Sequence, residues 1–127
     1  MPSERNDRPW GYYQVVDEGE GWQVKRICIR PTHRLSYQRH AYRSEHWYVV
    51  AGVGVATIDD VEIPVQQGST VEIAIGAAHR VANPVAGGAT TGQDLILIEV
   101  QTGSYFGEDD IERLSDDYAR TDSSSIS

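Results

Sequence analysis

The feature that most restricts the fold of this sequence is its regular succession of short apolar runs, each closed by turn residues. The run at 22–30 stops at Pro31, and the run at 53–58 turns at Asp59-Asp60 into another run. Six or more short runs at this spacing are typical of an antiparallel sandwich or barrel. We therefore predict an all-β fold.

Proline and acidic residues refine this prediction at two places. Pro64 lies inside its run and marks an edge strand, because proline donates no backbone hydrogen bond. The one helix candidate is a short C-terminal segment at 108–114, where acidic residues at the N-terminal end favour the helix dipole. We expect a single domain over residues 1–127, with a core of about 8–120 and loose termini.

Charge and cysteine content exclude several classes of function. The net charge is −8, which argues against a nucleic-acid backbone as the partner. No apolar run reaches the roughly 18 residues that cross a membrane, and the N-terminal residues lack the apolar core of a secretory signal. Cys28 is the only cysteine and lies between two isoleucines, so we predict a buried thiol in a reducing cytoplasm.

Metal-ligand residue types gather in the stretch LSYQRHAYRSEHW at 35–47. Strand alternation puts Gln38 and His40 on one face, Glu45 begins the returning strand, and a tight turn at Gly76 delivers His79. Two imidazoles, a carboxylate and an amide oxygen suit a divalent transition metal. Taken singly, each of these residues also fits a solvated or hydrogen-bonded strand position, so the spacing alone leaves both interpretations open.

The spacing of these residues resembles the two sequence motifs of the cupins. Three positions depart from the motifs, with Thr32 in place of glycine, Gln38 in place of the first histidine and Ala74 in place of proline. The resemblance implies a cupin double-stranded β-helix, a jelly-roll barrel. The first motif is matched by Thr32, Gln38, His40, Glu45 and Gly52, and the second by Gly68, Ala74, Gly76, His79 and Asn83.

More specific motifs resemble the type II phosphomannose isomerase domain, a cupin family. They cover residues 8–120, with Ala119 in place of a glycine as the clearest departure near the end. In that family glutamine often replaces the first cupin histidine, so Gln38 is compatible with a working metal site. The matching segments are RPWG at 8–11, VKRI at 24–27, LSYQRH at 35–40, EHW at 45–47, IEVQ at 98–101 and GEDDI at 107–111.

The resemblance implies interconversion of mannose 6-phosphate and fructose 6-phosphate with a divalent metal, which is Zn, Mn, Fe, Co or Ni. The reaction needs a general base besides the metal, and Glu99 is favoured over His46 because alternation turns His46 outward. For the final segment, substrate binding by its arginines and pairing with its own acids stay open as alternatives. We expect Gln38, His40, Glu45 and His79 to bind the metal, Glu99, Arg43 and Lys25 to act in catalysis, and Lys25, Arg43, Arg113 and Arg120 to bind the phosphate.

Partners and rival functions follow from the same resemblance. Many members carry a guanylyltransferase ahead of this domain, so a separate guanylyltransferase is a possible partner. We predict a homodimer with Trp10, Tyr12 and Trp22 as contact aromatics. The rivals to an isomerase are another metal cupin enzyme, such as an Fe(II) oxygenase, and a sugar-phosphate-binding module without turnover.

Overall fold

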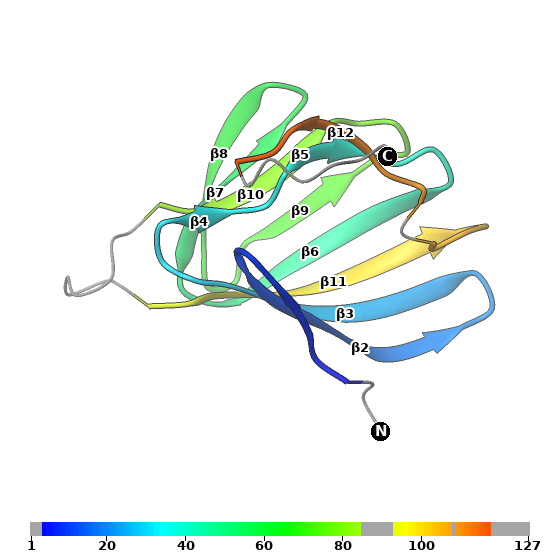
Figure 1. Cartoon of the computed structure of the whole chain (residues 1–127), viewed down its shortest axis with the longest axis horizontal. Helices are drawn as coiled ribbons and strands as arrows, with labels where there is room; N and C mark the ends of the chain where they lie inside the picture. Colours follow the sequence, from blue (N-terminus) through cyan, green and yellow to red (C-terminus); the bar gives the residue numbers. More distant parts are fainter. Residues whose placement is uncertain (1–3, 85–92, 108, 118–127) are drawn as a thin grey trace.

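Two antiparallel sheets form the protein in the computed structural model, which describes residues 4–84, 93–107 and 109–117 (Figure 1). The first sheet contains, in spatial order, β1 (Asn6–Arg8), β2 (Gly11–Gly19), β3 (Trp22–Ile29), β11 (Leu95–Gly103), β6 (Arg43–Ala51) and β9 (Thr70–Ile73). The second contains β12 (Glu112–Ser115), β5 (Tyr37–Arg39), β10 (His79–Asn83), β7 (Val53–Ile58) and β8 (Val61–Gln66), and β4 (His33–Arg34) also pairs with β10.

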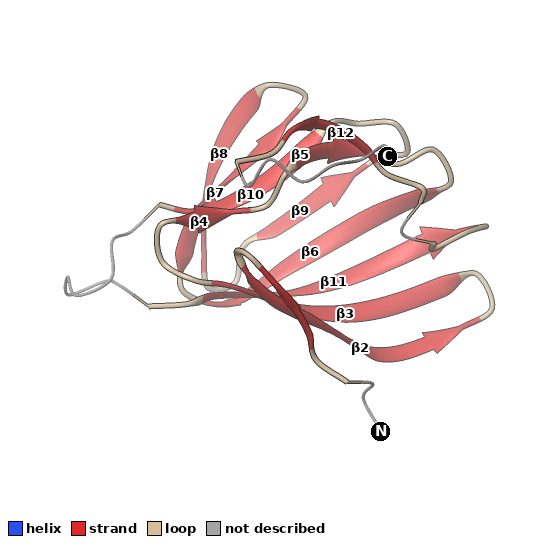
Figure 2. Cartoon of the chain, viewed as in Figure 1, coloured by secondary structure: helices blue, strands red, loops and turns tan. Residues whose placement is uncertain are grey.

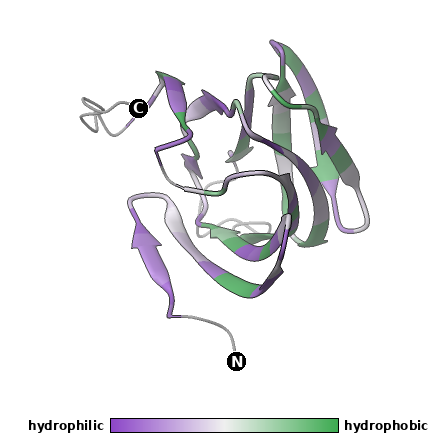
Figure 3. Ribbon diagram, turned by 90° about the vertical axis from the view of Figure 1, so that its right-hand side faces the viewer, coloured by the Kyte–Doolittle hydropathy of each residue, from purple (hydrophilic) through white to green (hydrophobic). Residues whose placement is uncertain are grey.

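The core lies between the two sheets and is built by strict alternation along the central strands. Trp47 and Val49 of β6 and Leu95 and Leu97 of β11 point inward, while their neighbours in sequence are more exposed. The change between hydrophobic and hydrophilic residues along the strands is visible in Figure 3. Burying such side chains is worth about 1.5–3 kcal/mol each, so these two strands anchor the barrel.

Alternation also explains why the barrel interior has an apolar half and a polar half. Towards one end of β6 the inward positions are Arg43 and Glu45, and towards the matching end of β11 they are Glu99 and Gln101. The antiparallel register places Gln101 opposite Glu45 and Glu99 opposite Trp47. The charged inward residues of two strands therefore meet at the same end of the barrel.

The predicted all-β jelly-roll fold is confirmed, but the predicted helix at 108–114 is wrong. The described residues of that stretch contain a turn and the start of β12, and Figure 2 shows no helix in the described part of the chain. β12 pairs with β5, with Glu112 opposite Arg39. The edge of β5 therefore provides hydrogen-bond partners for the backbone of β12. Long-range strand pairing outweighs the local preference of acidic residues for a helix start. None of the described residues belongs to a helix that is able to cross a membrane.

Three single-residue expectations and one departure from the cupin motif can be compared with the structure. Pro64 lies in β8, the edge strand of the second sheet, as predicted. Cys28 is buried, as predicted, and burial followed by repulsion from Asp94 raises the pKa of its thiol to about 11. Trp10 is 6% exposed and belongs to the core, so its prediction as a contact aromatic is wrong. Thr32 replaces the cupin glycine in a left-handed conformation, with φ of 69°.

Candidate metal centre and active-site cavity

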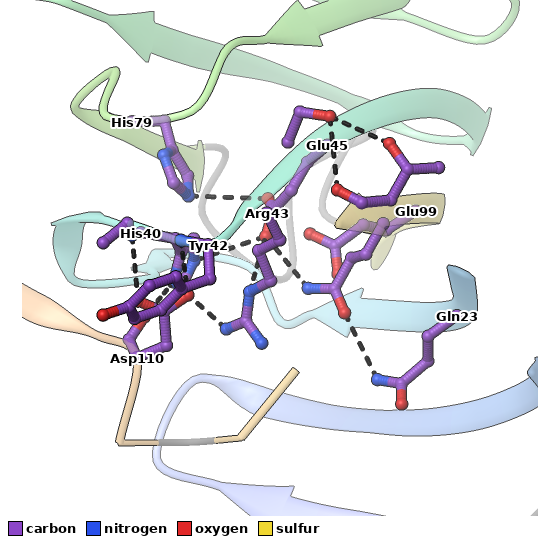
Figure 4. Close-up of polar contacts among 12 residues, drawn as sticks. Gln23, His40, Tyr42, Arg43, Glu45, His79, Glu99 and Asp110 are labelled. Atoms are coloured by element: carbon purple, nitrogen blue, oxygen red, sulfur yellow. Dashed lines mark hydrogen bonds and ion pairs between the residues drawn. The ribbon is translucent and has the colours of Figure 1, made fainter. Parts of the chain in front are cut away.

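Two histidines and a glutamate meet inside the polar half of the barrel. His40 directly follows β5, Glu45 lies on β6, and His79 begins β10. One ligand atom from each of the three lies within 4.8 Å of the others, and all three side chains are buried. Nε2 of His40 is 3.3 Å from Oε2 of Glu45, and Nε2 of His79 is 3.4 Å from Oε1 (Figure 4).

Both imidazoles are held with Nε2 turned towards Glu45. Nδ1 of His79 lies 3.0 Å from the carbonyl oxygen of Ala77, and Nδ1 of His40 lies 2.5 Å from that of Asp110. A carbonyl oxygen only accepts, so each Nδ1 carries the proton and each Nε2 is left with its lone pair in the neutral ring. Burial lowers the pKa of His79, against the attraction of Glu45, which favours the neutral ring that binds metals. The donor set therefore fits a divalent transition metal.

Gln38, the fourth predicted ligand, lies next to this cluster. Its backbone is paired with that of His79 across β5 and β10, and its half-buried side chain lines the same cavity. Its role as a ligand stays a prediction. His46, the rejected candidate base, points outward and bonds Oε2 of Glu72 at 2.8 Å.

A second buried carboxylate, Glu99, shares the cavity with Glu45. Burial, then repulsion from the Glu45 carboxylate and the hydrogen bond that protonated Glu99 donates to it, raises the pKa of Glu99 well above its usual value. Burial alone would raise the pKa of Glu45 too, but His40, His79 and the bond from Glu99 hold it well below its usual value. The two carboxyl groups thus differ in their affinity for a proton, with Glu45 kept as an anion and Glu99 holding a proton more readily than an ordinary glutamate.

Two further side chains fix the orientation of these carboxylates. Trp47 donates from Nε1 to Oε2 of Glu99 at 3.0 Å, and Gln101 donates from Nε2 to Oε2 of Glu45 at 2.9 Å. Gln23 in turn donates to the side-chain oxygen of Gln101 at 3.2 Å, so the amide nitrogen of Gln101 faces Glu45. Each carboxylate is therefore positioned by a donor that is itself packed or hydrogen-bonded.

Arg43 brings a buried cation to the metal cluster. It is 3% exposed, its Nε lies 3.9 Å from Oε2 of Glu45, and no described residue accepts a hydrogen bond from Nε or Nη1. Nη2 of Arg43 lies 3.1 Å from Nδ1 of His40. Because Nδ1 of His40 already donates to the carbonyl oxygen of Asp110, this contact brings two donors together. A guanidinium buried with so few acceptors is suited to an anionic ligand.

Other cations lie on the ring of Tyr13, which also lines the cavity. Nζ of Lys25 is 4.5 Å from the ring centre and Cζ of Arg8 is 5.0 Å from it, while Nη2 of Arg8 donates to the Tyr13 hydroxyl at 3.2 Å. Lys25 is buried, and its charge is one of the influences that lower the pKa of Glu99. Arg113 reaches the cavity from β12, whereas Arg120 lies outside the described residues.

The cavity that these residues line has a volume of about 80 Å³. That is room for several water molecules but about half of an engineered 150 Å³ cavity that holds benzene. Ile111 and Arg113, which come from beyond β11, form part of its wall.

Comparison with known proteins assigns the family. Residues 3–116 match the family described as Mannose-6-phosphate isomerase C-terminal. The chain belongs to this family. The match agrees with the resemblance found in the sequence and covers all the residues that line the cavity.

Curated relatives of this mannose-6-phosphate isomerase C-terminal domain are much longer proteins. Alginate biosynthesis protein AlgA of Pseudomonas aeruginosa is 49% identical over 115 residues, which are 90% of this chain and 22% of AlgA. Mannose-1-phosphate guanylyltransferase of Escherichia coli K12 is 44% identical over 115 residues, 89% of this chain and 22% of the relative. The chain thus spans under a quarter of the length of these relatives.

Solved structures support the cupin-type barrel of the domain at low sequence identity. CapF, the capsular polysaccharide assembling protein of Staphylococcus aureus, has a TM-score of 0.74 at 19% identity over 88% of this chain and 34% of CapF. Pac13, a nucleoside dehydratase, has a TM-score of 0.69 at 17% identity over 89% of this chain and 85% of Pac13. At this identity the likeness shows the fold alone.

Several cavity residues of the domain escaped the reasoning from sequence. Arg8 and Tyr13 belong to the N-terminal motif, but nothing local shows that β1 and β2 carry them to the metal cluster. Gln101 follows Glu99 by two positions on β11, so alternation does predict its inward side chain. Asp110 looks like a helix-start acid in the sequence and is instead buried beside His40.

Proposed function

We propose that this chain is a metal-dependent isomerase that interconverts mannose 6-phosphate and fructose 6-phosphate. The observation that carries the proposal is one cavity in which a buried His–Glu–His cluster meets a second carboxylate of raised pKa. The family description, Mannose-6-phosphate isomerase C-terminal, supports the proposal. Moving a proton between two adjacent sugar carbons requires a base close to a group that stabilises negative charge on the sugar oxygens.

Glu99 is the general base in this proposal. It takes the proton from C2 of the open-chain aldose and returns it to C1, while the hydroxyl proton of O2 is transferred to O1, and the two transfers together yield the ketose. Its raised pKa suits this task, because the carboxylate is then a stronger base than an ordinary glutamate. A divalent ion, when bound by His40, Glu45 and His79 with Gln38 alongside, supplies Lewis-acid stabilisation of the charge that develops on O1 and O2.

The proposal assigns two different roles to the cationic side chains of the cavity. Arg43 lies at the metal cluster, so we assign it to the sugar oxygens at the reacting end, in preference to the phosphate. Lys25 and Arg8 both lie against the ring of Tyr13 and, with Arg113, are assigned to the phosphate. Four cationic side chains and two carboxylates line the cavity, and this excess of positive charge favours a dianionic ligand.

Room for the substrate has to be made on binding. A hexose phosphate is larger than the cavity of about 80 Å³, and pockets for small ligands are typically about 300 Å³ or more. We expect the wall formed by Ile111 and Arg113 to shift outward, because these residues come from a separate edge of the barrel.

A coupled assay tests the proposal directly. Metal-free protein is supplied in turn with Zn²⁺, Mn²⁺, Fe²⁺, Co²⁺ and Ni²⁺, and formation of fructose 6-phosphate from mannose 6-phosphate is followed. We expect turnover with at least one metal and none in the presence of excess chelator. Tight binding of the sugar phosphate without turnover under every metal would contradict the isomerase and identify a binding module.

We propose that the protein forms a homodimer. We also propose that it functions with a separate guanylyltransferase, because two of the long relatives are named for alginate biosynthesis and for guanylyl transfer to mannose 1-phosphate. Of the aromatics expected at the dimer contact, Trp22 is 36% exposed and Tyr12 is half-buried. Light scattering that gives the 14.1 kDa monomer mass across micromolar concentrations would rule out the dimer.

A further inference from the structure

Asp110 is a buried acid in the segment that joins β11 to β12. This segment, of which the structure describes residues 104–107 and 109–111, is called the strap below. The carboxylate of Asp110 accepts the backbone N–H of Ala41 at 2.9 Å and that of Tyr42 at 3.1 Å, and the residue is 7% exposed. Ala41 and Tyr42 form the turn directly after His40, so the strap is fastened to the loop that carries a candidate ligand (Figure 4).

The backbone of the same residue acts on His40 itself. The carbonyl oxygen of Asp110 lies 2.5 Å from Nδ1 of His40, and it fixes both the tautomer and the direction of Nε2. His79 donates the equivalent bond from Nδ1 to the carbonyl oxygen of Ala77, two residues earlier in its own turn. The orientation of His40 therefore depends on a residue 70 positions distant, whereas that of His79 is local.

The strap is also anchored before Asp110. The N–H of Ser104 donates to the carbonyl oxygen of Tyr42 at 3.1 Å, and the ring of Tyr105 meets that of Tyr42 edge to face at 6.2 Å. Gly103 allows this approach, because a Cβ there would lie 2.1 Å from the Tyr42 carbonyl oxygen. Several contacts thus converge on the turn at 41–42.

We propose that Asp110 is a positioning residue of the metal centre: its carboxylate clamps the strap to the turn after His40, and its carbonyl aims His40 at the ion. The proposal rests on the metal site of the proposed function, but not on the isomerisation. Because binding effects are reciprocal, a metal at the cluster must also hold the strap in place.

Metal affinity separates this role from a merely structural one. The variants are Asp110→Ala, Asp110→Asn and the matched control Asp109→Ala, whose exposed carboxylate bonds only the hydroxyl of Tyr105 in the described structure. Affinities for Co²⁺ and Zn²⁺ are measured by competition with a chromophoric chelator, and the visible spectrum of bound Co²⁺ is recorded. We expect Asp110→Ala to bind about 10- to 100-fold more weakly with an altered Co²⁺ spectrum, Asp110→Asn to fall between, and Asp109→Ala to match the parent.

Hydrogen exchange on the unaltered protein gives a second measurement that no folding defect can obscure. We expect Zn²⁺ to slow exchange of the Ala41 and Tyr42 amides, which donate to Asp110, more than that of β8 amides far from the site. A folded Asp110→Ala variant with the Co²⁺ affinity and spectrum of the parent would overturn the proposal. An exchange rate at these two amides that does not change when Zn²⁺ is added would also overturn it. Absence of isomerase activity with normal metal binding would count against the proposed function alone.

Discussion

Replacing Arg43 by methionine separates the contribution of this residue to catalysis from its contribution to stability. Its ion pair with Glu45 at 3.9 Å is worth about 4 kcal/mol at the effective dielectric of a protein. Two buried N–H positions without acceptors, Nε and Nη1, cost about 1–3 kcal/mol each. These opposing contributions nearly cancel, so Arg43→Met should change the free energy of unfolding by less than about 2 kcal/mol.

Catalysis should respond far more strongly than stability. If the unpaired N–H groups of Arg43 bind the reacting oxygens, their loss removes a charge-assisted contact worth about 1.5–3 kcal/mol, or roughly ten- to a hundredfold in kcat/KM. The fall should appear in kcat, while Lys25→Met should instead raise KM for the phosphorylated sugar. Urea unfolding and steady-state kinetics measure the two effects side by side.

Arg34 provides the matched control for this experiment. Its guanidinium bonds Asp117 at 2.6 and 2.8 Å, is exposed, and does not line the metal cavity. An exposed pair of this kind contributes at most about 1 kcal/mol, so Arg34→Met should leave kcat/KM unchanged. Equal, small effects of the two substitutions on kcat/KM would refute the role of Arg43, as would a loss of activity explained entirely by unfolding.

The remaining predictions concern Glu99, Thr32 and Cys28. Glu99→Gln should retain metal and fold but lose about 10²–10⁴-fold in kcat. In the parent, kcat/KM should rise with pH through the raised pKa of Glu99, so an acid limb at the ordinary glutamate pKa of about 4.3 would exclude it as the base. The pKa of Glu99 is higher in the folded protein than in the unfolded chain, so ionisation of Glu99 destabilises the fold increasingly as pH rises above the unfolded-chain pKa. In denaturant titrations, the stability of Glu99→Gln relative to the parent should therefore increase from acid to neutral pH. Thr32→Gly should raise stability by about 0.5–1 kcal/mol, because an exposed β-branched residue at φ of 69° is strained; a lower melting temperature would contradict this. Cys28 should resist thiol reagents at pH 8 until the protein is unfolded, since its pKa is about 11, and rapid labelling of native protein would show otherwise.

The metal cluster was predictable because strand alternation and motif spacing are strong local signals. His40 and Glu45 flank one short connection, and their inward direction follows from period two along β5 and β6. His79 required the second motif, which places it at the start of another strand. Pairing of β10 with β5 then brings the residues together, and the jelly-roll resemblance supplied that topology.

The strap and the N-terminal hairpin were not predictable, because their positions depend on distant partners. The acids at 108–112 have a local preference for a helix start, yet the open edge of β5 and the N–H groups at 41–42 determine the observed path. Arg8 and Tyr13 reach the cavity through pairing of β1 and β2 with the rest of the first sheet. Sequence patterns give the face of a strand, but not which loop covers the end of the barrel.

The opposition between an acidic exterior and a cationic interior has a kinetic consequence. The protein carries a net charge of −8, whereas four cationic side chains and two carboxylates line the cavity. The dianionic sugar phosphate of the proposed function would therefore be repelled at long range and attracted only after it enters the cavity. Salt screens the long-range repulsion over a Debye length of about 10 Å at 0.1 M, but it screens the buried contacts much less.

The rate of substrate capture should accordingly hold or rise as salt increases from about 0.01 to about 0.1 M. Enzymes whose surface field steers an oppositely charged substrate show the reverse, a steep fall in association rate. Under the proposed function, selection among anions therefore takes place inside the cavity, and the net charge of the protein slows the approach of every anion alike.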